Sequence, residues 1–282
     1  MDQSLTIAGV EVPRFLYGTA WKEDSTQKLT ELALAQGFRG IDTANQRKHY
    51  DEAAVGRAIS EAIARGQLAR DDVCVQTKYT FQRGQDHRLP YDPASPVPTQ
   101  VEASFASSLQ HLNVERVDSY ILHGPTGSVG ISQDDWAAWR TMEQIYESGR
   151  TRLLGVSNVS LEQLQLLCRD SKVQPHFVQN RCYAVHGWDR EVRDFCNAES
   201  VVYQGFSLLT ANRAMMASNE LAKIAERHRC SAAQVVFSFA MSVGMIPLTG
   251  TSDARHMQAD LDAFDLQLEP EEIDLVERLA GQ

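Results

Sequence analysis

The chain contains the run Ser119-Tyr120-Ile121-Leu122-His123, followed by an amphipathic segment near 134 to 148 and then by the run Leu153-Leu154-Gly155-Val156-Ser157. The two outer runs are short and apolar, as buried strands are, whereas the middle segment has the apolar spacing of a helix. A strand, a helix and a second strand in this order indicate one unit of a parallel sheet. The fold therefore depends on how often this unit recurs.

The alternation recurs about eight times over the 282 residues, which predicts one α/β domain over residues 1–282, a single (β/α)8 TIM barrel. A short N-terminal β-hairpin is expected over Leu5 to Val12, around Ala8-Gly9, where it can plug one barrel end. The barrel strands are expected at Arg14 to Tyr17, Gly40 to Thr43, Val73 to Lys78, Ser119 to His123, Leu153 to Ser157, Phe177 to Asn180, Val201 to Tyr203 and Met245 to Pro247. Helices are expected near 25 to 36, 51 to 65, 99 to 112, 134 to 148, 160 to 170, 189 to 198, 217 to 242 with a break at Cys230-Ser231, 253 to 263, and after Pro270.

Composition and charge exclude several classes of protein. No apolar run is long enough to span a bilayer, and residues 1–4 lack the basic start of a secretory signal, so a cytoplasmic protein without membrane association is expected. The five cysteines include no CxxC pair, which argues against a disulfide or zinc framework. The net charge of -10 opposes nucleic-acid binding, so any anionic ligand must be held by local groups.

Polar side chains stand at the carboxyl ends of successive predicted strands, where catalytic residues of such barrels gather. Asp42, Lys78 and His123 lie at the ends of the second, third and fourth strands. Taken singly, the aspartate could form a turn, the lysine could face solvent and the histidine could be a hydrogen-bonded core residue. Three on successive strands favour a shared site, in which a buried Lys78 and Asp42 would be expected to pair.

These segments resemble the aldo-keto reductase family over nearly the whole chain. The resemblance rests on Gly37-Phe38-Arg39-Gly40-Ile41-Asp42-Thr43-Ala44, Thr77-Lys78, Asp118-Ser119-Tyr120-Ile121-Leu122-His123-Gly124-Pro125, Gly155-Val156-Ser157-Asn158 and Gln179-Asn180. It implies NADP-dependent reduction of a small carbonyl substrate, with Asp42, Lys78 and His123 catalytic. It also implies that Ser157, Asn158 and Gln179 contact the nicotinamide amide, and that the protein is a monomer.

The family's catalytic tyrosine is assigned to Tyr50, although the stretch Asn45 to His49 before it is longer than usual. His49 and Tyr79 are the alternative donors. Reduction adds hydride to the carbonyl carbon while the oxygen gains a proton, so a donor must touch that oxygen. We expect Lys78 to lower the phenol pKa, Asp42 to hold Lys78, and His123 to donate to the carbonyl oxygen.

The cofactor segments match the family only approximately. There is no GxGxxG motif, so the last loops of the barrel must hold the phosphates. The resemblance implies that Tyr203 stacks on the nicotinamide and that the other contacts are Ser207, Leu209, Thr251, Ser252, Arg255, His256 and Asp260. Because the family's lysine for the 2'-phosphate has no counterpart here, NADPH is the first choice and NADH the alternative.

The substrate pocket is expected to include Trp21, Tyr79 and Gly124, with walls from residues 81–98 and 210–218. It should admit bulky aldehydes or ketones. One alternative is a nicotinamide-binding barrel that senses or regulates with little turnover. Another, a metal-dependent hydrolase, lacks support because the strand ends carry no HxH pair or His/Asp cluster, so no metal is expected.

Overall fold

The structure is a computed structural model and describes residues 1–279. Eight parallel strands close into a barrel in the order β10-β3-β4-β5-β6-β7-β8-β9, which confirms the predicted (β/α)8 architecture. The expected seventh strand was too short, since β9 continues three residues beyond Tyr203 to Phe206. The barrel strands are β3 (Leu16–Gly18), β4 (Gly40–Asp42), β5 (Cys74–Tyr79), β6 (Val117–Leu122), β7 (Thr151–Ser157), β8 (Phe177–Arg181), β9 (Val202–Phe206) and β10 (Ile246–Thr249).

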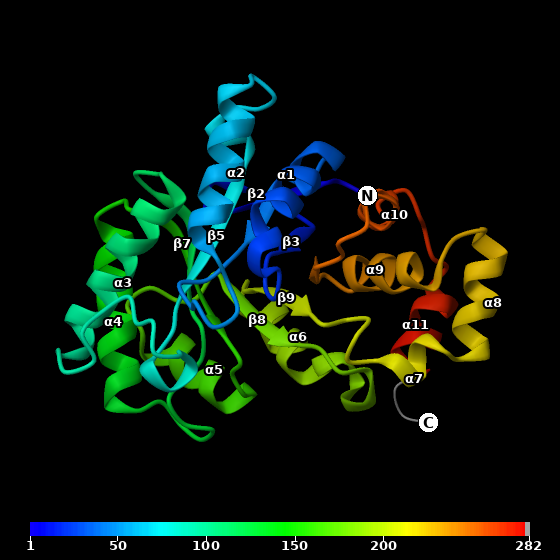
Figure 1. Cartoon of the computed structure of the whole chain (residues 1–282). Helices are drawn as coiled ribbons and strands as arrows, with labels where there is room; N and C mark the ends of the chain where they lie inside the picture. Colours follow the sequence, from blue (N-terminus) through cyan, green and yellow to red (C-terminus); the bar gives the residue numbers. More distant parts are fainter. Residues whose placement is uncertain (280–282) are drawn as a thin grey trace.

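Helices surround the barrel, as Figure 1 shows. The long segment expected near 217 to 242 is two helices, α8 (Asn219–His228) and α9 (Ala232–Ser242), which confirms the predicted break. Within residues 1–279 no helix has both the length and the apolar character that crossing a membrane requires. The other α-helices are α1 (Thr26–Gln36), α2 (Glu52–Ala64), α3 (Val97–Leu112), α4 (Gln133–Glu147), α5 (Leu161–Asp170), α6 (Arg190–Ala198), α7 (Arg213–Met216), α10 (Ala254–Asp262) and α11 (Pro270–Arg278).

The N-terminal hairpin forms as expected, from β1 (Ser4–Ile7) and β2 (Val10–Pro13). Its apolar side chains Ile7, Val10 and Val12 belong to one buried cluster with inward-facing barrel residues such as Ile121 and Phe177. The hairpin therefore caps the apolar interior at the amino-terminal end of the barrel. The polar interior residues lie nearer the other end.

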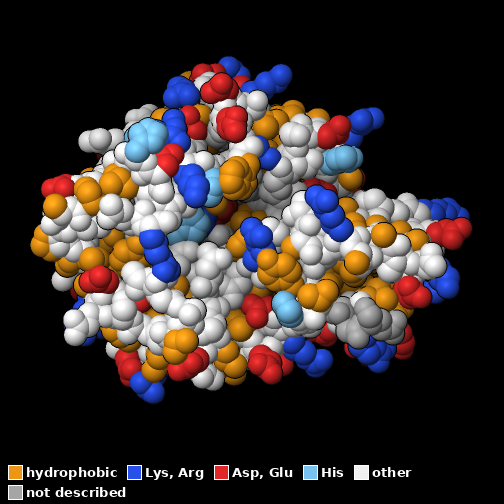
Figure 2. Space-filling view, turned by 60° about the horizontal axis from the view of Figure 1, so that its bottom comes forward, with side chains coloured by type: hydrophobic (Ala, Val, Ile, Leu, Met, Phe, Trp, Pro, Cys, Tyr) orange, Lys and Arg blue, Asp and Glu red, His pale blue; other side chains and the backbone are white. Residues whose placement is uncertain are grey.

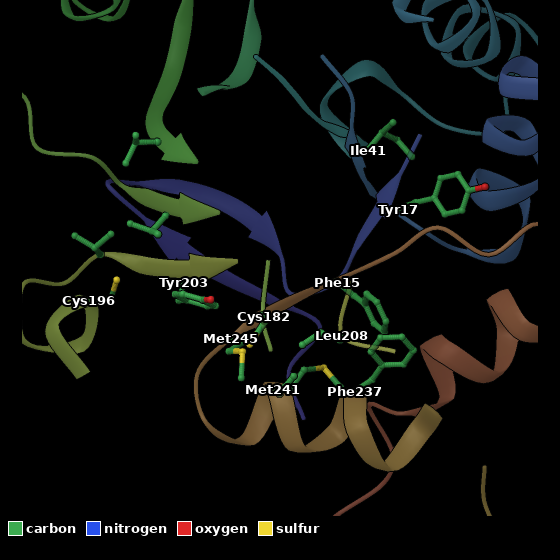
Figure 3. Close-up of a cluster of buried hydrophobic side chains, with 14 of the residues drawn as sticks. Phe15, Tyr17, Ile41, Cys182, Cys196, Tyr203, Leu208, Phe237, Met241 and Met245 are labelled. Atoms are coloured by element: carbon green, nitrogen blue, oxygen red, sulfur yellow. The ribbon is translucent and has the colours of Figure 1, made fainter. Parts of the chain in front are cut away.

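The larger core lies between the outer face of the strands and the helices. Figure 3 shows part of it where β9 meets α9, with Tyr203, Cys182, Met245 and Met241 close together. Aromatic contacts such as Phe15 with Phe237, 4.8 Å between ring centroids, join the residue just before β3 to α9. This packing makes a rigid support for the loops at the carboxyl ends of the strands.

Candidate active site

A cleft of about 780 Å³ opens where the barrel strands end. Figure 2 shows the hollow on this face, with Lys, Arg and His side chains around it. Both the first and the last β/α loops contribute, because Trp21, Lys22, Thr251 and His256 all line the cleft. Thr210 also lines it, but residues 81–98 do not, which corrects the expectation that this loop forms a wall.

Asp42 and Lys78 form a buried ion pair at the floor of the cleft. The Lys78 ammonium donates to Asp42 Oδ1 and Oδ2 at 2.6 and 2.7 Å and to the Thr43 carbonyl at 2.8 Å. Burial lowers the pKa of Lys78, and contact with the Asp42 carboxylate opposes that effect. The expected pairing of Asp42 with Lys78 is therefore present, and all three ammonium protons are directed to these acceptors.

Tyr50 reaches the same floor from the long loop that follows β4. Its backbone N–H donates to the Gln46 carbonyl at 3.0 Å, and Asp51 directly after it caps α2 by accepting from the Ala54 N–H. The loop is braced from outside because the Gln46 side chain donates to the Gly84 carbonyl. The Lys78 Nζ atom lies 5.4 Å from the centre of the Tyr50 ring.

The electrostatic surroundings of Tyr50 differ from the expectation. Burial raises the pKa of the Tyr50 phenol, and the negative charge of Asp42 raises it further. The net direction is therefore opposite to the expected lowering, and the Lys78 ammonium donates to Asp42 and Thr43, with no hydrogen bond to the phenol oxygen. The phenol is thus held protonated in this arrangement.

His123 follows β6 directly and faces Tyr50, with 6.0 Å between the ring centroids. Its Nδ1 shares a hydrogen bond of 2.7 Å with the Thr80 hydroxyl. Burial and the nearby Lys78 charge lower the pKa of His123 to about 3, so the imidazole is neutral. The structure therefore brings Asp42, Tyr50, Lys78 and His123 together around one point.

The residues expected at the nicotinamide amide also lie in the cleft. The Ser157 hydroxyl donates to the Gln179 carbonyl at 2.6 Å, and the Asn158 side chain donates to the His123 carbonyl at 2.8 Å. Asn158 adopts a left-handed backbone conformation (φ 55°), which its short amide side chain tolerates better than most residues. These bonds connect the ends of three neighbouring strands.

Tyr203 does not lie in the cleft, which corrects its assignment as the stacking aromatic. Its side chain is on the outer face of β9, 2% exposed, and its hydroxyl donates to Asp189 Oδ2 at 2.8 Å. Figure 3 shows Tyr203 beside Cys182 in the core. Phe206, which ends β9, lines the cleft instead.

Two of the three residues expected to line the substrate pocket do not line the cleft. Tyr79 is fully buried outside the barrel, where it contacts Phe81 and Tyr91, so it can be neither a pocket wall nor the proton donor. Gly124 does not line the cleft, and a Cβ there would meet Asn158 at 3.5 Å. Trp21 does line it and is 70% exposed, with its ring tilted by 36° against the His49 ring and 3.7 Å between the two ring centroids.

The phosphate-side residues divide into two groups. The cleft is lined by Ser207, Leu209, Thr251, His256 and Asp260 but not by Ser252 and Arg255. The Arg255 side chain is 89% exposed and pairs with Asp253 at 3.3 Å. Asp260 accepts from the Thr249 hydroxyl at 2.7 Å, and burial raises its pKa to about 6.

Two cationic cleft residues were missed from the sequence. The Lys22 ammonium donates to the Gly250 carbonyl and lies 5.8 Å from the Tyr17 ring centre, beside the last loop. Arg181 lies over the Phe206 ring at 5.6 Å. Since side chains alternate along a strand, Arg181 faces the same way as Gln179, a signal that strand parity could have provided.

No group of three or more His, Cys, Asp and Glu in residues 1–279 is arranged to hold a metal ion. All five cysteines are unpaired in the described chain, and four of them are buried. Burial raises the pKa of Cys74, Cys168, Cys182, Cys196 and Cys230, which suits packing rather than thiolate chemistry.

Fold and site together indicate a barrel oxidoreductase, with a buried Asp–Lys pair at the floor of a cleft that a tyrosine and a histidine line. Residues 15–280 match the model of the aldo/keto reductase family, and the chain belongs to that family. Its members reduce carbonyl groups of small molecules with nicotinamide cofactors.

Individual relatives agree with this membership. Glyoxal reductase of Bacillus subtilis (strain 168) is 27% identical over 276 residues, covering 96% of this chain and 90% of its own. NAD(P)H-dependent 6'-deoxychalcone synthase of Glycine max is 29% identical over 265 residues, covering 88% and 79%. An aldo-keto reductase from a Medee basin deep-sea metagenome library has the same fold, with a TM-score of 0.84, 22% identity and coverage of 99% and 96%.

Proposed function

We propose that this protein reduces aldehydes and ketones to alcohols with NADPH and that Tyr50 donates the proton. One observation carries the proposal. The Tyr50 ring lies 5.4 Å from the Lys78 ammonium and 6.0 Å from the His123 ring, on the floor of the cleft. A proton donor, a compensating cation and a neutral hydrogen-bond donor thus face the same small space.

The residues present fit a nicotinamide dinucleotide, which when bound supplies a hydride equivalent. Phe206 offers an aromatic face, and Ser157, Asn158 and Gln179 offer polar groups for the carboxamide. Lys22 adds a cation beside the last loop, where the phosphates would lie. The other proposed contacts are Ser207, Leu209, Thr251, His256 and Asp260, which line the cleft, whereas Ser252 and Arg255 do not.

The four polar residues have complementary roles as hydride reaches the carbonyl carbon. The carbonyl oxygen gains negative charge, which neutral His123 meets by donating a hydrogen bond. Tyr50 gives its proton to that oxygen, and the positive charge of Lys78 offsets the phenolate that results. Asp42 keeps the Lys78 ammonium in place throughout.

NADPH is our first choice of cofactor. NADH is the alternative, because the Arg255 side chain that would bind the 2'-phosphate faces solvent and does not line the cleft. Titration of the quenching of tryptophan fluorescence with both cofactors tests this, since Trp21 lines the cleft. If Arg255 reads the 2'-phosphate, Arg255→Ala weakens NADPH more than NADH. If Lys22 reads it, Lys22→Met does so instead, and equal losses for both cofactors exclude either residue as the reader.

The proposal as a whole is tested by single-turnover oxidation of bound NADPH with a panel of aromatic and aliphatic aldehydes. Turnover supports a reductase. The alternative is a sensing or regulatory barrel, favoured by one observation: the Lys78 protons are all directed away from the Tyr50 oxygen. Tight NADPH binding without oxidation by any carbonyl in the panel would support that alternative and reject the reductase.

A further inference from the structure

Beneath the Asp42–Lys78 pair lies a layer of three glutamines. Gln76, Gln179 and Gln204 come from β5, β8 and β9 and are 1%, 3% and 0% exposed. Barrel interiors are packed mainly with bulky apolar side chains, so three buried amides in one layer need a reason. We define these residues as the glutamine layer.

The hydrogen bonds of the layer meet at Asp42. Gln76 Nε2 donates to Asp42 Oδ1 at 2.7 Å, and Gln179 Nε2 donates to the same oxygen at 3.0 Å. The same two nitrogens donate to Gln204 Oε1 at 2.8 and 2.9 Å. Gln204 Nε2 donates back to Gln76 Oε1 at 3.1 Å.

The orientation of each amide follows from the chemistry of Asp42. A carboxylate paired with an ammonium only accepts, so both glutamines that face Asp42 must present nitrogen to it. Each of those nitrogens then points its second proton at Gln204, which must present its oxygen. Reversing the Gln204 amide would set its NH2 group against two other NH2 groups, so the layer has one consistent arrangement.

Gln179 alone connects this layer to the cleft. Its two Nε2 protons are used by Asp42 and Gln204, while no residue of the described chain donates to its Oε1. Because Gln179 lines the cleft, that oxygen is an acceptor available to a ligand. The matching ligand group is an N–H donor, such as the NH2 of a nicotinamide carboxamide.

We propose that Gln76 and Gln204 are positioning residues that hold Gln179 Oε1 toward the cleft as an acceptor for the carboxamide NH2. This inference rests on the proposed use of a nicotinamide cofactor. The same layer holds Asp42 and, through Asp42, Lys78. One hydrogen-bond network therefore orients both the acceptor for the carboxamide, Gln179, and the Asp42–Lys78 pair beside Tyr50.

The test compares NADP+ with its 3-acetylpyridine analogue, which has a methyl ketone in place of the carboxamide and lacks the NH2 donor. Binding is followed by quenching of tryptophan fluorescence. We expect the wild-type protein to bind NADP+ at least about tenfold more tightly than the analogue, as one hydrogen bond to a buried acceptor allows. In Gln204→Met, Gln179 loses one of its two acceptors, and this ratio should fall below about threefold.

Two further variants separate positioning from general damage. Gln204→Glu keeps an acceptor for Gln76 and Gln179, so it should retain the wild-type ratio even if both affinities change. Gln100→Met removes a buried amide outside the barrel, where Gln100 donates to the Ser95 carbonyl, and should also leave the ratio unchanged. If Gln204→Met does not fold, Gln76→Met takes its place, because it removes the acceptor that orients Gln204, and the ratio should then fall at least twofold.

Each outcome has one meaning. A folded Gln204→Met or Gln76→Met protein with the wild-type ratio overturns the role of the layer. Equal binding of both cofactors by the wild-type protein overturns the role of Gln179 while leaving carbonyl reduction untouched. Failure of the wild-type protein to bind either cofactor rejects the proposed function itself.

Discussion

Tyr50 shows how a single residue depends on charges around it. Burial and the Asp42 carboxylate both raise the pKa of its phenol, so losing the proton requires that the Lys78 charge act on the phenolate. The Lys78 ammonium is 5.4 Å from the centre of the Tyr50 ring and donates to the Asp42 carboxylate. A carbonyl oxygen bound between Tyr50 and His123 can receive a proton only from a group in direct contact with it, and Tyr50 is the proposed donor.

We therefore expect Tyr50→Phe to lower kcat/KM for carbonyl reduction by roughly 10²- to 10⁴-fold, the usual contribution of a positioned general acid. The Kd for NADPH should stay within about twofold, because removing the hydroxyl leaves the cleft otherwise intact. NADPH oxidation followed by absorbance measures the first quantity and fluorescence titration the second. His49→Gln is the matched control: equal activity in wild type and Tyr50→Phe, with a loss in His49→Gln, would move the donor to His49.

Asp260 makes a second prediction at this scale, through stability. Burial raises its pKa to about 6, above the 3.8 of an exposed aspartate. Between these values the folded state holds a proton that the unfolded state has lost, so this stabilising contribution is present below pH 3.8 and is lost as the pH rises through 6. The penalty at pH 8 is as much as about 3 kcal/mol, at about 1.4 kcal/mol for each pKa unit.

Asp260→Asn keeps an oxygen that accepts from the Thr249 hydroxyl but cannot ionise. Its free energy of unfolding in urea should be nearest that of the wild type below pH 3.8 and should exceed it at pH 8. Asp262→Asn, which removes an exposed carboxyl from the same helix, is the matched control. His256 lies near Asp260, so a gain that disappears in a His256→Gln background would assign the effect to the histidine instead.

At the scale of elements, strand length and parity explain which site residues the sequence could predict. Asp42 is the last residue of β4, Lys78 is the next-to-last residue of β5 and His123 directly follows β6, and the apolar runs of these strands are clear in the sequence. Tyr203 was misplaced because the seventh strand was expected to end at that residue, whereas β9 continues to Phe206. The residue three positions later on the strand, Phe206, faces the cleft, and Tyr203 faces the core.

The parity argument would have corrected Tyr79 as well. Since Lys78 points into the barrel, its neighbour on β5 must point outward, into the contacts with Phe81 and Tyr91. Lys22 is different because it lies in a loop. Its approach to the Gly250 carbonyl depends on closure between β3 and β10, which no local pattern records.

Helix α2 gives a prediction about packing between elements. At Gly56 it approaches α3 so closely that a Cβ would lie 2.1 Å from the His111 carbonyl oxygen and 2.7 Å from Leu112 Cα. Both are backbone atoms, so the helices would have to separate. Helix propensity alone would favour alanine by about 1 kcal/mol, whereas overpacking costs about 1–3 kcal/mol.

We expect overpacking to prevail, so that Gly56→Ala lowers the free energy of unfolding and the Tm. Gly127→Ala is the matched control because its nearest atom would be 3.6 Å away in an exposed loop. Thermal unfolding by circular dichroism compares the two. A Gly56→Ala protein at least as stable as the wild type would show that α2 and α3 adjust without cost and that propensity decides.

At the scale of the whole molecule, the cleft joins parts of the chain that are far apart in sequence. Its lining runs from Trp21 and Lys22 after β3 to Asp260 in α10, and these loops meet only because β10 pairs with β3 to close the barrel. The closed barrel follows from the eightfold alternation in the sequence. The interior of the barrel is apolar at the hairpin end and polar at the cleft. This division depends on which residues of all eight strands face inward at the same level, and no single strand reveals it.

A ligand that spans this cleft should therefore stabilise the barrel as a unit. Binding to the folded state alone adds about 2.7 kcal/mol when the ligand is at 100 times its Kd. At roughly 2–4 °C for each kcal/mol in a protein of this size, NADPH should raise the Tm by about 5–10 °C.

Calorimetry with NADPH, NADH and free AMP, each at the same multiple of its Kd, tests whether the rise in Tm depends only on how much of the protein is occupied. A Tm unchanged by saturating NADPH would mean that the cofactor does not bind the folded barrel. A rise that appears in one of two separated unfolding transitions would mean that the two ends of the chain do not unfold together, so that closure between β10 and β3 is weaker than the rest of the barrel.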